Sequence, residues 1–199
     1  MKIKLVLFTL IAGLVSTAGA GELAIGSDLP SPDYTMQAVG GSEVSLKSAM
    51  GKEGLVVIFS CNTCPWVMAW EDRYVTLASA YEPKGLGFVA VNSNAAYRTG
   101  VDSMDEMAAH AKDKGYNFDY TVDVDSKLAR EFGATRTPHV YVFDKLGKLV
   151  YRGAIDDNAH KPKAVEETYL ADALDALLAG KTIEQNSTKA LGCSIKFSD

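Results

Sequence analysis

The sequence predicts an α/β fold in which one β-sheet is covered by helices on both faces. Two continuous apolar runs, over residues 55–59 and 86–91, are typical of strands that are buried on both sides. Helical patterns alternate with these runs, and a hairpin followed by a last helix completes the order of elements. No internal repeat or low-complexity segment interrupts it.

The first twenty residues have the three parts of a secretory signal peptide. Lys2 and Lys4 precede an apolar stretch over residues 5–15, and small residues at 18–20 precede Gly21. The apolar stretch is shorter than the roughly 20 residues that a membrane-spanning helix needs, and no cysteine follows the small-residue site to carry a lipid anchor. We therefore expect cleavage near the 20/21 junction and a periplasmic or secreted protein with no membrane insertion.

The rest of the chain is predicted to form one domain, and its charge excludes some classes of partner. After a lead-in segment over residues 21–33, the patterns predict one domain over 34–180 and a C-terminal tail over 181–199. The formal net charge is −5, and the basic residues do not cluster. These features argue against nucleic acid and anionic membrane surfaces as partners.

The first half of the domain alternates strands and helices. A strand-like segment over residues 34–38 precedes the buried run at 55–59. Apolar residues then recur at spacings of three and four over residues 67–81, which indicates an amphipathic helix that Pro83 ends. The second buried run leads through a polar loop into a helix predicted over residues 103–114.

The second half is predicted to add a short strand, a short helix, an antiparallel hairpin and a last helix. These elements cover residues 118–122, 123–132, 139–143 with 149–151, and 165–178. Asp123 or Asp125 can cap the short helix, and a Gly-containing loop joins the hairpin strands. We expect the hairpin at one edge of the sheet, so that the sheet is mixed.

A Cys-x-x-Cys motif follows the first buried run, where a strand turns into a helix. The positive end of the helix dipole and its free N–H groups favour a thiolate, which lowers a cysteine pKa below its free value of about 8.5. The thiolate attacks disulfides, and a second thiol can resolve the mixed disulfide. We expect Cys61 to attack and Cys64 to resolve. A static disulfide or half of a zinc site are the alternatives.

A second motif places a proline directly before a strand, in the run TRTPHVYVFD over residues 135–144. Together, the strand–CxxC–helix and this Thr-Pro–strand–hairpin–helix order resemble the thioredoxin superfamily over roughly residues 34–180. The resemblance implies a three-layer α/β/α sandwich with a central mixed sheet. It also implies a cis Thr137–Pro138 bond beside the CxxC motif, and pairing of the Thr137 backbone with an extended segment of a partner.

The branch of this superfamily that the chain resembles is the redoxin, or peroxiredoxin-like, group with a CxxC motif. The long connection before Arg136 and the tail run GCSIK over residues 192–196 carry this resemblance. Thioredoxin itself has Trp before the first Cys, Gly-Pro between the cysteines and a buried acid six positions earlier, where this chain has Ser60, Asn62-Thr63 and Leu55.

The resemblance implies a thiol–disulfide oxidoreductase that exchanges disulfides with partner proteins and with an upstream electron donor or acceptor. Its redox group is the Cys61–Cys64 disulfide, and no organic cofactor or metal is required. Two alternatives remain open. One is a thiol peroxidase, because Cys64-Pro65 resembles the peroxidatic Cys-Pro of peroxiredoxins, although Cys61 replaces their Thr. The other is a copper chaperone, because thiolates with His139 suit Cu(I).

Two further residues are candidates for the site. Trp66 is the aromatic residue nearest to the cysteines in sequence and can line the substrate groove together with Thr137 and Pro138. Cys193 is the odd third thiol. It can act as a second resolving thiol, pair with another molecule, or be a small buried apolar residue.

Overall fold

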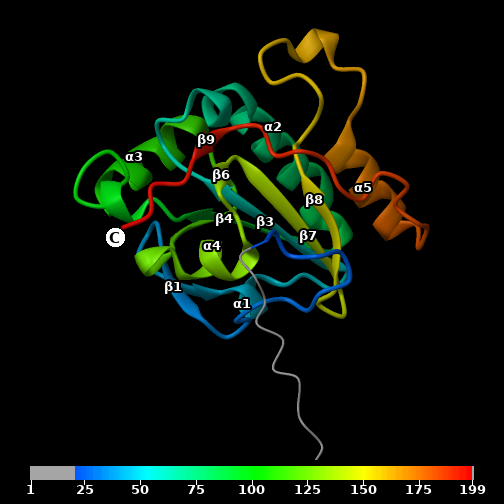
Figure 1. Ribbon diagram of the computed structural model, residues 1–199, viewed down its shortest axis with the longest axis horizontal. Coiled ribbons are helices and arrows are strands. Elements are labelled where there is room, and N and C mark those ends of the chain that lie inside the picture. Colours follow the sequence, from blue (N-terminus) through cyan, green and yellow to red (C-terminus); the bar gives the residue numbers. More distant parts are fainter. Residues whose placement is uncertain (1–20, 199) are drawn as a thin grey trace, which may run out of the picture.

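A seven-stranded mixed sheet with helices on both faces forms the centre of the structure (Figure 1). The structure is a computed structural model that describes residues 21–198, so the predicted signal peptide lies outside the described residues. The predicted three-layer α/β/α sandwich is confirmed. No helix within the described range is long and apolar enough to cross a membrane.

The strands follow the order β2-β1-β5-β4-β3-β7-β8 across the sheet. In that order they cover Glu43–Ser45, Thr35–Ala38, Asp119–Val122, Leu86–Asn92, Gly54–Ser60, His139–Asp144 and Leu149–Gly153. Strands β5, β4 and β3 are parallel, and the pairs at both ends of the sheet are antiparallel. Two short strands, β6 (Arg136–Thr137) and β9 (Cys193–Ser194), form a separate antiparallel pair.

The helices divide between the two faces. One face carries α2 (Pro65–Tyr81), α3 (Met104–Lys114) and α5 (Tyr169–Leu178), and the other carries α1 (Leu46–Ala49) and α4 (Lys127–Phe132). Short 3-10 turns cover Glu82–Lys84, Ala95–Tyr97, Val124–Ser126 and Pro162–Ala164.

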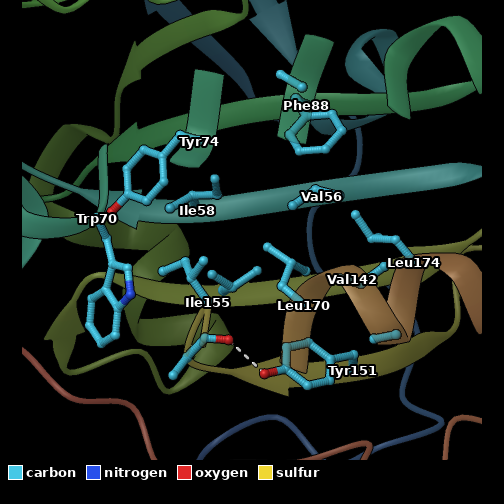
Figure 2. Close-up of a cluster of buried hydrophobic side chains, with 14 of the residues drawn as sticks. Val56, Ile58, Trp70, Tyr74, Phe88, Val142, Tyr151, Ile155, Leu170 and Leu174 are labelled. Carbon is cyan, nitrogen blue, oxygen red and sulfur yellow. Dashed lines mark hydrogen bonds between the residues drawn. The ribbon is translucent and has the colours of Figure 1, made fainter. Parts of the chain in front are cut away.

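The central strand β3 is buried along its whole length, as its apolar run predicts. Because side chains alternate across a strand, Val56 and Ile58 face α2 and α5, where they pack with Trp70 and Leu170 (Figure 2). Phe59 and its same-face neighbours pack against α1 and α4. Burying each such aliphatic side chain stabilises the fold by about 1.5–3 kcal/mol, so the end of β3 is a rigid support for the loop that follows it.

The last helix differs from its predicted bounds, because α5 begins at Tyr169 rather than at residue 165. The Asp157 carboxylate accepts the Glu166 N–H at 3.1 Å, and the Asp157 N–H donates to the Glu167 carbonyl at 3.2 Å. These bonds hold the segment before the helix in a non-helical path. The capping prediction at Asp123 is confirmed, since its carboxylate accepts the N–H groups of Leu128 and Ala129 in α4, each at 3.0 Å.

Candidate active site

The CxxC motif lies at the junction between β3 and α2. Strand β3 ends at Ser60, and Cys64 is the N-cap residue of α2, with Pro65 in the first helical position. Proline suits that position because its missing N–H would have no partner in the helix. Cys61 and Cys64 are both buried, with exposed fractions of 3% and 4%. The predicted strand-to-helix location of the motif is confirmed.

Thr137 and Pro138 lie beside this junction, and the Thr137–Pro138 bond is cis, as the resemblance implied. Cys61 Sγ is 3.3 Å from the Thr137 hydroxyl oxygen, and Cys64 Sγ is 3.1 Å from the Thr137 carbonyl oxygen. One residue of β6 therefore contacts both sulfurs of the motif.

Cys193 joins the site from the C-terminal tail. Its Sγ lies 2.7 Å from Cys64 Sγ, and all three cysteines are in the free thiol state. The pairing of β9 with β6 sets Cys193 directly opposite Thr137. Cys64 is thus the central sulfur of three, in contact with a thiol of its own motif and with a thiol of the tail.

Hydrogen bonds among the thiols determine where the negative charge lies. The interaction with the Cys61 thiol is the largest cause that lowers the pKa of Cys64. The Cys193 thiol and the Val67 backbone N–H act in the same direction, so that the pKa of Cys64 falls to about 4 despite burial. The contact with Cys64 raises the pKa of Cys61, and burial raises that of Cys193 to about 11.

The lowered pKa favours Cys64 as the thiolate. The order of attack that the sequence suggested, with Cys61 attacking and Cys64 resolving, stays a prediction. At pH 7 a free cysteine with a pKa of about 8.5 is only about 3% ionised, whereas a Cys64 pKa lowered to about 4 favours the thiolate at that pH. The pKa of Cys64 is lower than that of Cys61 because Cys64 is the N-cap of α2 and interacts with the thiols of both Cys61 and Cys193.

Titration of the reduced protein tests this assignment. We expect the thiolate absorbance near 240 nm to persist at pH 5.5 and to be lost as the pH falls through about 4, because the folded-state pKa of Cys64 is lowered. The Cys64→Ala variant should lack this step. A thiolate signal that develops only above about pH 8, the range of an unperturbed cysteine, would contradict the assignment.

A buried carboxylate supports the loop between the two cysteines. Asp102 is fully buried, and its carboxylate accepts the Asn62 backbone N–H at 2.9 Å. The side-chain amides of Asn92 and Asn94 donate to the same carboxylate at 2.8 Å each. The Tyr120 hydroxyl donates to the Asn62 side-chain oxygen at 2.9 Å. This network fixes the CxxC loop at Asn62, and the sequence analysis missed it because Asp102 lies 40 positions away from Asn62.

The remaining candidates divide into those near the thiols and those away from them. Trp66 is half-buried in the first turn of α2, its backbone N–H points to Cys193 Sγ, and the centroid of its ring lies 5.1 Å from that of the His160 ring.

His139 is buried beside Tyr141, with ring centroids 4.4 Å apart, and burial lowers its pKa to about 3. Its Nδ1 atom lies 3.3 Å from the Tyr141 hydroxyl oxygen. Across residues 21–198, no three His, Cys, Asp or Glu side chains are grouped as a metal site.

Comparisons with known proteins agree with this geometry. The redoxin family model matches residues 25–169. A search of curated proteins found no match. One similar crystal structure is that of an uncharacterized conserved protein from Geobacillus kaustophilus. Its sequence is 35% identical, the TM-score is 0.81, and the match covers 88% of this chain and 93% of that chain. The crystal structure of a hypothetical protein from Sinorhizobium meliloti is also similar. Its sequence is 30% identical, the TM-score is 0.82, and the match covers 89% of this chain and 97% of that chain.

A more distant structure shows the same fold. A putative thiol:disulfide interchange protein DsbE from Chlorobium tepidum is 18% identical, with a TM-score of 0.62 over 79% of this chain and 97% of that chain. The likeness extends over almost the whole of that protein, so the three-layer architecture described above is the thioredoxin-like fold.

Proposed function

This chain belongs to the redoxin family, and we propose that it is an exported thiol–disulfide oxidoreductase that exchanges disulfides with partner proteins through Cys61 and Cys64. The observation that carries the proposal is the position of Cys64. Its sulfur sits at the N-terminus of α2 with a lowered pKa, next to the Cys61 thiol and to the edge of β6 before Pro138. The proposed export rests on the N-terminal sequence pattern.

The proposed reaction begins with the Cys64 thiolate. It attacks one sulfur of the partner's disulfide, a Cys64–partner bond forms, and the other partner sulfur leaves as a thiolate that takes up a proton. The Cys61 thiol then loses its proton and attacks Cys64 Sγ. The Cys61–Cys64 disulfide forms, the partner leaves with two thiols, and two electrons have passed to the partner. In the reverse direction the protein oxidises dithiols.

The groove for the partner lies along β6. Thr137 of β6 pairs with Cys193 of β9, so an extended chain of the partner can pair with Thr137 when the tail leaves this edge. Pro138 shapes the end of this groove, and Trp66 lines it next to the sulfurs. The redox group is the cysteine pair itself, so the proposed reaction uses no organic cofactor or metal.

A thiol peroxidase is the second candidate, and one observation favours it. A peroxidase needs a thiolate that attacks an O–O bond, and Cys64 has both the lowered pKa and the following Pro65. In that reaction the Cys64 thiolate becomes a sulfenic acid and releases an alcohol or water. A neighbouring thiol then condenses with the sulfenic acid to give a disulfide and water.

Parallel single-turnover assays separate the two candidates. The reduced protein is mixed with an excess of a disulfide-bridged peptide in one arm and with hydrogen peroxide in the other. We expect one peptide disulfide to be reduced per protein molecule, at a rate well above that of peroxide loss. Peroxide consumption without reduction of the peptide disulfide would reject the oxidoreductase proposal and support the peroxidase.

A further inference from the structure

The C-terminal tail lies in the groove that we assign to the partner. Strand β9 pairs antiparallel with β6, with Cys193 opposite Thr137 and Ser194 opposite Arg136. In Figure 1 this segment, drawn in red, passes β6 on its way to the C-terminus. An extended chain of the protein itself thus makes the backbone contacts that the thioredoxin resemblance assigns to a substrate.

The tail is held there by contacts on both sides of Cys193. Gly192 approaches the backbone so closely that an added Cβ would overlap with the Thr137 carbonyl. On the other side, the Ile195 N–H donates to the Thr135 carbonyl at 3.0 Å, and its side chain is buried. The Lys196 N–H donates to the Asn94 side-chain oxygen at 2.8 Å. These contacts fix the register of the tail and, with it, the position of the Cys193 sulfur.

When the tail is docked, the thiols of Cys61 and Cys193 both lie next to Cys64. Cys193 Sγ lies 2.7 Å from Cys64 Sγ, the Cys61 thiol interacts with the same sulfur, and the Trp66 backbone N–H points to Cys193 Sγ. An intramolecular thiol at this distance has a high effective concentration at Cys64. Either thiol can therefore form a disulfide with the central sulfur.

We propose that Cys193 is a third catalytic thiol, and that the disulfide of the oxidised protein moves from Cys61–Cys64 to Cys64–Cys193 when the tail returns to the groove. In this step the Cys193 thiolate attacks Cys64 Sγ and the Cys64–Cys193 bond forms. The Cys61–Cys64 bond breaks, and Cys61 leaves as a thiolate that takes up the proton released by Cys193. The step is an isomerisation, so it consumes no oxidant beyond the partner disulfide. It rests on the proposed function.

The location of the disulfide tests this proposal directly. The protein is oxidised with oxidised glutathione, its free thiols are blocked with N-ethylmaleimide, and it is digested with trypsin. Cys61 and Cys64 share the tryptic peptide 53–73, whereas Cys193 lies on peptide 190–196. We expect the main product to link the two peptides through Cys64 and Cys193, with the maleimide on Cys61. A disulfide confined to peptide 53–73, with maleimide on Cys193, would overturn the proposal.

Tail variants provide the matched comparison. Gly192→Ala introduces the Cβ that overlaps with Thr137, so the share of linked peptides should fall several-fold. Ser194→Ala changes an exposed side chain of the same strand and should keep that share. An unchanged share in Gly192→Ala would also contradict the proposal. Failure of the proposed function gives a different result, because the protein would then reduce no peptide disulfide in the assay above.

Discussion

The Cys64→Ala variant is expected to reduce peptide disulfides no faster than the uncatalysed reaction. Cys64 is the thiol whose pKa is lowered, and burial still raises the pKa values of Cys61 and Cys193 when Cys64 is removed, so neither can replace it near pH 7. The measurement is the single-turnover reduction of a disulfide-bridged peptide, followed by titration of the released thiols.

Thr63→Ala is the matched control for this variant. Thr63 lies between the two cysteines but is exposed, so its replacement should change the exchange rate little. The assignment of Cys64 as the attacking thiol would be wrong if Cys64→Ala kept its activity and Cys61→Ala lost it. That result would support the order of attack that the sequence pattern suggested.

The Trp70→Ala variant is expected to lose about 3–5 kcal/mol of the free energy of unfolding, the usual cost of removing a fully buried Trp. Trp70 is completely buried between α2 and the sheet (Figure 2), and its indole N–H donates to the Asp156 carboxylate at 2.8 Å. The variant leaves a cavity in the core and removes one donor from a buried carboxylate that also contacts Arg73.

Urea unfolding measures this loss, and Trp66→Ala serves as its control. Trp66 is half-buried and one turn away on the same helix, so its replacement should cost clearly less. A loss below about 1 kcal/mol for Trp70→Ala, far under the range for buried aromatic residues, would show that the packing around α2 is described incorrectly.

Local patterns predicted most of the fold because they depend on neighbours in sequence. The uniform apolar run of β3, the spacing of apolar residues in α2 and the proline before β7 each indicated an element that the structure contains. The strands β2, β6 and β9 and the helix α1 were missed, since each has only two to four residues and none contains a run of apolar residues.

The details of the site depend on contacts between distant segments, and these left no local pattern. Cys193 contacts Cys64 across 129 positions, so the sequence left its role open among three alternatives. Leu55 stands where thioredoxin has a buried acid, and it packs in the apolar core. A buried acid, Asp102, instead approaches from the loop after β4. The choice between Cys61 and Cys64 as the thiolate likewise required the positions of all three sulfurs.

The measurement that tests the central claim most directly is the capture of a mixed disulfide by the Cys61→Ala/Cys193→Ala double variant. This variant keeps the Cys64 thiol and lacks both thiols that could resolve an adduct. After reaction with a disulfide-bridged peptide, mass spectrometry should find one peptide bound per protein, joined to Cys64, and released by dithiothreitol. Absence of any adduct on Cys64 would contradict the account that this protein exchanges disulfides with its partners.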